Sequence, residues 1–138
     1  ALRMARNYVV FEVFGTPAGF DARIERGGAP VARLGDELVH AAGDVAVVVP
    51  PTLDPRSARA DVAPEITTRI YFADPSGRSL LAEAEGDAPL SVPVPGPGVL
   101  RVEVWIRPRH LAPYLGEVAA DYVDGAVPWI QTGGIFLR

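Results

Sequence analysis

The chain has 138 residues, 49% of them hydrophobic, and a net charge of -4, so it is long and apolar enough to bury the core of one domain. This composition excludes a disordered acidic tail, because such tails lack the apolar surface that offsets chain entropy. The absence of cysteine excludes disulfides, thiolate metal sites and thiol nucleophiles.

The first six residues, Ala-Leu-Arg-Met-Ala-Arg, are strong helix formers, whereas the residues that follow favour strands. A helix of this length is not stable alone in water, because nucleation is unfavourable and few hydrogen bonds offset it. We therefore expect residues 1–6 to be the tail of a helix from a missing upstream domain. Residues 7–138 are expected to form a β-sandwich accessory domain.

Alternating patterns rich in β-branched residues, bounded by turn signals, predict strands in the first half of the chain. The expected strands lie at 7–14, 20–25, 37–39 and 44–50. The first ends at the turn signal Gly15-Thr16-Pro17, and the second ends at Gly27-Gly28. The fourth is apolar on both faces, which is typical of a central strand.

The next stretch, 50–64, carries several prolines and charges, and an extended loop is predicted for it. After it, residues 65–73 and 79–85 flank Asp74-Pro75-Ser76-Gly77. Proline suits the second position of a β-turn and glycine the last. These residues therefore predict a β-hairpin.

The following strands are expected at 90–94 and 99–106, on either side of the turn Pro95-Gly96-Pro97-Gly98. We predict that these two strands pair with each other in an antiparallel manner. A final strand is expected over 130–137.

One stretch departs from the strand pattern, because apolar residues in 110–123 are spaced nearer to 3.6 than to 2. We predict a short helical excursion there, broken near Pro113 and Gly116. Short strands with regular turns otherwise predict an all-β fold, namely an antiparallel Ig-like β-sandwich of about seven to nine strands.

Three parts of the chain together resemble a known family. They are residues 1–11, the strand at 98–104, and Val127–Ile130 followed by Ile135–Leu137. They resemble the region after the catalytic barrel of polymerase-and-histidinol-phosphatase (PHP) family proteins. In that region an Ala-Leu-Arg helix end runs into Tyr-Val-Ala-Phe, and the chain finishes Pro-Trp-Ile, then Ser-Asn-Pro-Ile-Tyr-Val. Two positions depart from that pattern: Leu100 stands where Tyr is frequent, and Gln131–Gly134 replaces Ser-Asn-Pro.

The resemblance implies a two-part enzyme whose barrel binds divalent metals and hydrolyses a phosphoester or a related bond. This chain would be the non-catalytic domain that follows the barrel, with no catalytic residue, cofactor or metal of its own. Its partner would be the upstream barrel, whose substrate access it could help to shape. When excised, the domain is expected either to self-associate or to leave its first residues mobile. The candidate interface or structural residues are Leu2, Met4, Tyr8, Phe11, Pro128, Trp129, Ile130 and Phe136.

A search of the residues themselves finds no constellation for catalysis. His40 and His110 lack the short-range histidine or carboxylate partner that metal spacing usually provides, so neither is expected to bind a metal. The serines lie outside any Gly-x-Ser-x-Gly motif, so none is expected to act as a nucleophile.

Aromatic residues in the C-terminal third indicate an alternative function, because sugar-binding sandwiches present such rings as stacking platforms. The four candidates are Trp105, Tyr114, Tyr122 and Trp129. Trp129 lies in the apolar sequence Val-Pro-Trp-Ile, which favours a position in the core or at a domain interface. We therefore prefer the accessory-domain interpretation, and two exposed coplanar rings would favour a carbohydrate-binding module.

Nucleic acids and membranes are not expected partners. All 13 basic residues are arginines scattered singly along the chain, so no basic stripe is available to neutralise a phosphate backbone. The longest uncharged apolar run, Val45–Pro51, is far shorter than the roughly 20 residues of a membrane helix. The residues leave the cellular compartment open, with the cytoplasm slightly favoured.

Overall fold

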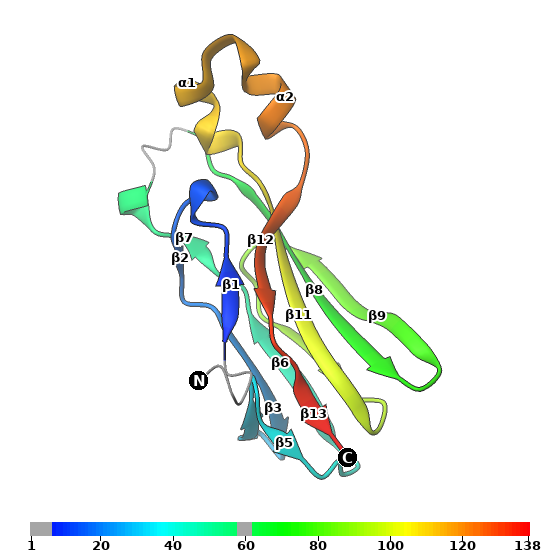
Figure 1. Ribbon diagram of the computed structural model, residues 1–138. Helices are drawn as coiled ribbons and strands as arrows, with labels where there is room; N and C mark the ends of the chain where they lie inside the picture. The colour runs from blue at the N-terminus through cyan, green and yellow to red at the C-terminus, as the bar shows by residue number, and fades with distance from the viewer. Residues whose placement is uncertain (1–6, 58–61) are drawn as a thin grey trace.

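Two β-sheets lie face to face in the computed structural model, which describes residues 7–57 and 62–138 (Figure 1). A short helical segment stands at one end of the pair of sheets. The predicted class, an all-β antiparallel Ig-like sandwich with a helical excursion, is confirmed. The helix tail predicted over residues 1–6 lies outside the described residues.

The first sheet is centred on two long antiparallel strands, β8 (Glu65–Asp74) and β11 (Gly98–Arg107). Its other strands are β9 (Gly77–Glu85), β12 (Val127–Thr132), β13 (Ile135–Leu137), β1 (Tyr8–Val10) and β5 (Glu37–Leu38). β9 pairs with β8, while β12 and β13 share the opposite edge of β11. Outside them, β1 pairs with β12 in antiparallel and β5 pairs with β13 in parallel.

The second sheet has four antiparallel strands, and a two-stranded ladder lies beside it. In spatial order, the four strands are β10 (Leu90–Pro93), β6 (Asp44–Val49), β3 (Asp21–Arg26) and β4 (Ala29–Arg33). The separate ladder joins β2 (Pro17–Ala18) to β7 (Thr52–Leu53). The central position predicted for residues 44–50 is confirmed, because β6 has a neighbour on each side.

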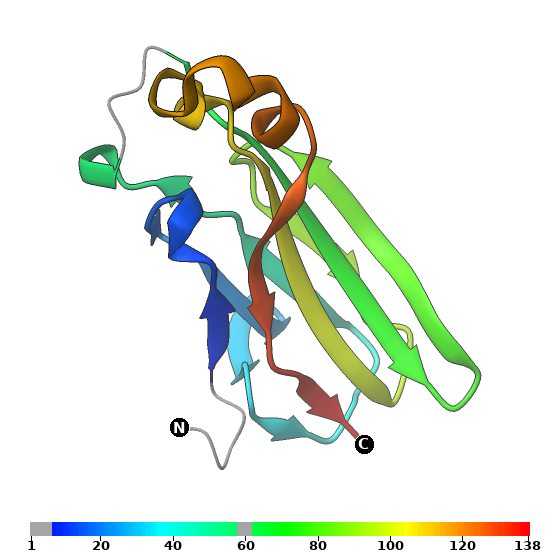
Figure 2. The same cartoon turned by 45° about the horizontal axis from the view of Figure 1, so that its top comes forward.

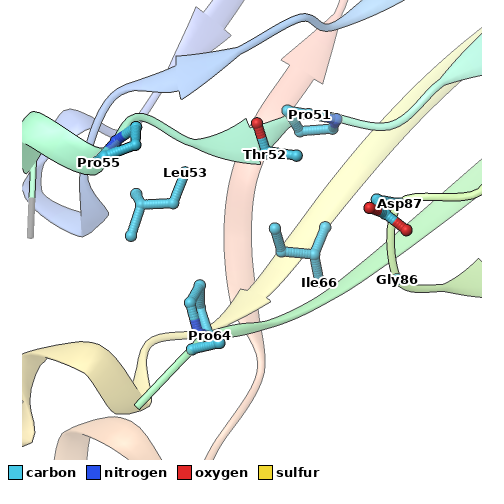
Figure 3. Close-up of a pocket in the computed structure, with 9 residues that line it drawn as sticks. Pro51, Thr52, Leu53, Pro55, Pro64, Ile66, Gly86 and Asp87 are labelled. Atoms are coloured by element: carbon cyan, nitrogen blue, oxygen red, sulfur yellow. The ribbon is translucent and has the colours of Figure 1, made fainter. Parts of the chain in front are cut away.

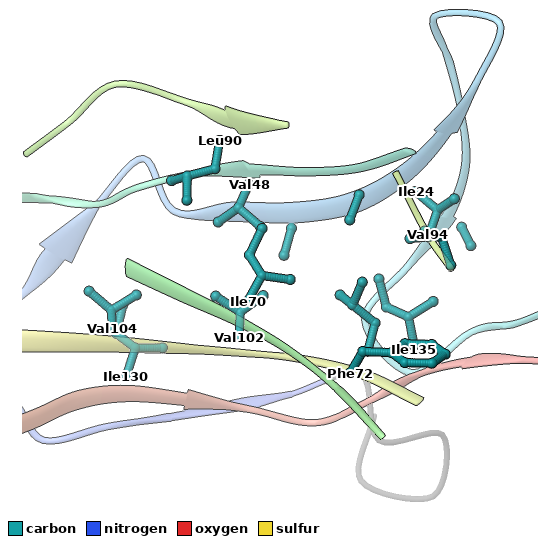
Figure 4. Close-up of a cluster of buried hydrophobic side chains, with 14 of the residues drawn as sticks. Ile24, Val48, Ile70, Phe72, Leu90, Val94, Val102, Val104, Ile130 and Ile135 are labelled. Atoms are coloured by element: carbon teal, nitrogen blue, oxygen red, sulfur yellow. The ribbon is translucent and has the colours of Figure 1, made fainter. Parts of the chain in front are cut away.

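The core lies between the two sheets (Figure 4). Ile70, Val102 and Ile130 of the first sheet are fully buried, as are Ile24 and Val48 of the second. Removing each such side chain from water contributes about 1.5–3 kcal/mol, so the alternating inward positions of the strands stabilise the sandwich. β-Branched residues suit these positions because they pack well on a pleated surface.

The helical excursion predicted over 110–123 is confirmed and is built from four short turns. They are η4 (Arg109–Leu111), α1 (Ala112–Leu115), η5 (Gly116–Val118) and α2 (Ala119–Val123). Gly116, with a φ of 59°, separates α1 from the following turn, as the sequence predicts. Figure 2 shows the excursion beyond the ends of β11 and β12. Within the described residues, no helix is long and apolar enough to cross a membrane.

The predicted hairpin around residues 74–77 is confirmed as β8 and β9. Its turn is stabilised by Asp74, whose Oδ1 accepts hydrogen bonds from the backbone N and the Oγ of Ser76 at 2.8 and 2.5 Å. Asp and Ser at these positions form such local bonds readily, which explains why the turn can be predicted from sequence.

The single strand predicted over 7–14 is wrong in its second half. β1 ends at Val10, and Glu12–Phe14 forms a 3-10 turn, η2. Gly15 follows this turn with a φ of 106° and a ψ of 165°, a conformation essentially restricted to glycine, so the chain cannot continue there as a regular strand.

The single strand predicted over 130–137 is two strands, β12 and β13. Gly133 and Gly134 interrupt the pairing, and a Cβ on Gly134 would lie only 2.7 Å from Cγ1 of Val99. The break lets β12 pair with β1 and β13 pair with β5. One edge of β11 therefore pairs with two successive strands, β12 and β13, which have β1 and β5 as their outer neighbours.

The predicted pairing of residues 90–94 with 99–106 is wrong. β10 pairs with β6 in the second sheet, whereas β11 pairs with β8 in the first. The turn at Pro95–Gly98 therefore connects the two sheets. Leu90 and Val94, on the β10 side of this turn, are buried in the core that the sheets share. The backbone N of Val94 also donates to the carbonyl oxygen of Asp44 at 2.9 Å.

Other elements were not predicted from the sequence. β4 directly follows Gly27-Gly28, so these glycines join a hairpin as well as ending β3. Their φ angles of 60° and 81° match the turn that two-residue hairpins prefer. The predicted loop over 50–64 contains β7 and a 3-10 turn, η3 (Pro55–Ser57).

Candidate functional site

The predicted interface residues fall into two groups in the structure, apart from Leu2 and Met4, which lie outside the described residues. Trp129 and Ile130 are fully buried, so they support the fold from within. Tyr8, Phe11 and Phe136 are exposed, and Pro128 is half-buried. Burial of Trp129 confirms the core position that its apolar neighbours predict.

Exposed apolar side chains gather where β1 runs into η2. Tyr8, Val9, Phe11 and Val13 are 45%, 54%, 42% and 73% exposed, and we call these four residues the β1–η2 edge. They lie on an outer edge of the first sheet, because among the described strands β1 pairs with β12 alone. The ring of Tyr8 meets that of Phe20 edge to face, with centroids 5.3 Å apart, which ties the edge to the second sheet.

Two side chains from the C-terminal half hold the end of this edge in place. The indole Nε1 of Trp129 donates to the carbonyl oxygen of Gly15 at 2.9 Å. Nε2 of His110 lies 2.9 Å from the carbonyl oxygen of Phe14. Because a carbonyl oxygen only accepts hydrogen bonds, Nε2 must carry the proton of a neutral His110 ring. Two consecutive carbonyls are therefore fixed by η4 and β12.

His110 is buried, and burial lowers its pKa below the ordinary value of 6.5, although the bond to Phe14 acts weakly in the opposite direction. Its Nδ1 atom has no hydrogen-bond partner within the described residues. A second proton would therefore be both desolvated and unpaired. The neutral ring therefore links the helical excursion to η2 through its hydrogen bond to the carbonyl oxygen of Phe14.

His40 is not isolated from carboxylates, contrary to the prediction. Its Nδ1 lies 3.4 Å from Oδ2 of Asp44, four residues further along the chain. Asp44 is buried and is mainly held by Arg26, whose Nε and a terminal nitrogen donate to it at 2.7 and 3.1 Å. The backbone N of Ala41 donates to the same carboxylate at 2.9 Å. No cluster of three or more metal-ligating side chains occurs in residues 7–57 and 62–138.

Trp105 is half-buried under a charged side chain on the outer face of the first sheet. The guanidinium of Arg69 lies 5.0 Å from its ring centroid, and its Nε1 donates to Oε2 of Glu103 at 3.2 Å. Arg78 covers Tyr71 in the same way, at 3.8 Å. The contact with Arg69 covers one face of the Trp105 ring, so a sugar that stacked on that face would have to displace the guanidinium.

Among the four aromatic candidates for sugar binding, Tyr114 and Tyr122 are the exposed pair. They are 60% and 64% exposed and belong to the helical excursion. Trp129 cannot present its ring to a ligand, because it is completely buried. The aromatic ring contact found among the described residues is that of Tyr8 with Phe20, so the two tyrosines do not stack on each other.

A pocket of about 490 Å³ opens between the β7–η3 segment and the start of β8 (Figure 3). Its lining residues come from the β7–η3 region, from the approach to β8 and from the turn after β9. They are Pro51, Thr52, Leu53, Pro55, Ala63, Pro64, Ile66, Gly86 and Asp87. No sequence motif marks this pocket, because its walls are proline and aliphatic residues from three separate segments.

Comparisons of the chain with protein-family models, with characterised proteins and with solved structures found no match. The resemblance to the PHP-associated region therefore rests on the residues quoted for it above. Those residues and the surface of the molecule are the basis on which a function can be inferred.

Proposed function

We propose that this chain is a non-catalytic accessory domain of a PHP-family metal-dependent hydrolase and packs on the catalytic barrel through the β1–η2 edge. The observation that carries the proposal is the gathering of Tyr8, Val9, Phe11 and Val13 on one edge of the sheet. In this proposal the divalent metals and the catalytic residues belong to the barrel.

The chemistry of this edge supports a covered rather than a solvated surface. Proteins usually protect an edge strand with charges, proline or a bulge, because its free N–H and C=O groups can pair with another chain. β1 consists of Tyr8, Val9 and Val10 and carries none of these devices. Glu12 is the charged residue of the adjoining turn. A neighbouring domain would bury the edge and remove the hazard.

The edge is also held in a defined shape, which favours docking. His110 and Trp129 fix the carbonyls of Phe14 and Gly15, immediately after the exposed residues. A surface that is already ordered loses less conformational entropy when a partner covers it. Contacts between domains of one chain usually bury roughly 600–1,500 Å², which is larger than four side chains provide, so the barrel would extend beyond this edge.

Hydrogen exchange tests the proposal when the 138-residue chain is compared with a longer product of the same gene. We expect amides of residues 8–13 to be more protected in the longer chain. Val13→Asp should remove the added protection, because it places a charge in the contact. Val39→Asp is the matched control, since Val39 is also 73% exposed but lies outside the β1–η2 edge. Equal protection in both chains would overturn the proposal.

Carbohydrate binding is the second candidate, and the exposure of Tyr114 and Tyr122 is the observation in its favour. Calorimetric titration with a panel of oligosaccharides tests it. Binding that is lost in both Tyr114→Ala and Tyr122→Ala, and kept in Trp105→Ala, would support a platform on the helical excursion. Absence of heat with every sugar of the panel would count against this candidate.

A further inference from the structure

The pocket between β7–η3 and the start of β8 has the size and composition of a small-molecule site. Ligand pockets in proteins typically measure about 300–1,000 Å³ and are mostly apolar, with a few polar groups that orient the ligand. This pocket measures about 490 Å³. Its position does not depend on the β1–η2 edge, so it can be tested independently of the proposed function.

The floor of the pocket is apolar and continuous with the core. Leu53 and Ile66 are half-buried and pack against the core cluster. Pro51, Pro55 and Pro64 form rigid walls, because the ring of proline fixes its backbone angle. Such walls change little when a ligand enters, which lowers the entropic cost of binding. This lining fits a flat or branched apolar group.

One charged side chain stands at the rim. Figure 3 shows Asp87 at the end of the pocket away from Leu53, near Thr52 and Pro51. No hydrogen bond or ion pair of Asp87 occurs in the described part of the chain. The neighbouring arginine of η3, Arg56, is engaged by Asp54 at 2.8 Å. The rim therefore offers an unpaired negative charge and a hydroxyl beside an apolar floor.

We propose that this pocket binds a small amphipathic cation, an aromatic ring linked by a short chain to an ammonium group. The ring would lie on Leu53 and Ile66 between the prolines, and the ammonium group would pair with Asp87. An apolar cavity of about 150 Å³ already holds benzene, so the pocket has room for the ring and its linker. The pocket is open to solvent, so binding in the millimolar range is expected.

The experiment is an NMR titration of the ¹⁵N-labelled 138-residue chain with phenethylamine and, separately, with phenethyl alcohol as its uncharged analogue. We expect shift changes concentrated at Thr52, Leu53, Ile66, Gly86 and Asp87. The amine should bind roughly threefold more tightly than the alcohol, the effect of one partly solvated ion pair. Asp87→Asn should abolish that preference while leaving the alcohol unaffected.

A second variant separates the pocket from non-specific association. Ala63→Trp places a large side chain in the pocket and should remove the shift changes caused by both probes. Ala42→Trp, at an exposed turn position outside the lining, is the matched control and should bind like the wild type. Shift changes that survive Ala63→Trp, or that are absent at millimolar amine, would overturn the site. Equal binding of amine and alcohol would overturn the cationic ligand.

Discussion

The indole nitrogen of Trp129 donates to the carbonyl oxygen of Gly15 at 2.9 Å, across 114 positions of the chain. The bond satisfies the one polar atom of a completely buried side chain and fixes the backbone immediately after η2. It thereby couples the C-terminal strand β12 to the exposed β1–η2 edge.

Trp129→Ala should lower the free energy of unfolding by about 3–5 kcal/mol, because it removes a buried aromatic ring and leaves a cavity. Trp129→Phe keeps most of the ring and should cost about 1–3 kcal/mol, since the carbonyl of Gly15 loses its donor. Urea unfolding measures both. Trp105→Phe is the control and should cost less than either, as its indole donates at the half-exposed sheet surface. A loss below about 1 kcal/mol for Trp129→Ala would contradict the buried position.

Gly15→Ala should destabilise the fold more than Gly19→Ala. Gly15 has a φ of 106° with a ψ of 165°, and an added Cβ would lie 2.4 Å from Cδ1 of Leu53. The backbone strain alone costs about 1–3 kcal/mol. Gly19 also has a positive φ, 77°, but no atom lies within 4 Å of the position that an added Cβ would take. Thermal unfolding of the two variants under one condition checks which is destabilised more. Equal losses of stability would show that the backbone around Gly15 can relax to accept a side chain.

The buried His110 should make stability depend on pH below its ordinary pKa of 6.5. Burial lowers its pKa in the folded chain, so the unfolded chain binds more protons as the pH falls through that value. Stability therefore falls on acidification from about pH 6.5 until the lower folded pKa is reached, with a slope of at most about 1.4 kcal/mol per pH unit. His110→Gln retains an amide donor for Phe14 and should flatten this part of the curve. Urea unfolding between about pH 7.5 and 5 measures it, and parallel curves for both chains would refute the assignment.

The buried carboxylate of Asp44 should also make the stability of the fold depend on pH, but at lower pH values than His110 does. Its hydrogen bonds from Arg26 are the main cause of a pKa below the ordinary 3.8 in the folded chain. Its contribution to stability is therefore present above about pH 3.8 and is lost as the pH falls through the folded pKa. Asp44→Asn should cost about 1–3 kcal/mol at neutral pH, and the difference from wild type should shrink below pH 3.8.

The control for this prediction is Asp21→Asn. Asp21 is partly exposed and pairs with Arg23 and Arg33 at 2.7 and 3.0 Å. Such solvated pairs contribute about 0–1 kcal/mol. Chemical unfolding at two pH values compares the variants. A cost for Asp21→Asn as large as that for Asp44→Asn would show that burial of the carboxylate is not what matters.

Local patterns in the sequence determined the fold class, the central strand β6, the hairpin at residues 74–77 and the helical excursion. Each depends on residues that are close in the chain, because alternation, turn chemistry and helical spacing are short-range properties. The core position of Trp129 could also be inferred from its apolar neighbours.

Only the tertiary structure decided which strands are partners. β10 pairs with β6 and not with β11, and residues 127–137 divide into two strands with different neighbours. These choices follow from how two sheets share one core, which a short stretch of sequence does not encode. The same holds for the site: Phe14 and Gly15 meet His110 and Trp129 only after the chain has closed, and the pocket at Asp87 is assembled from segments that are remote in sequence.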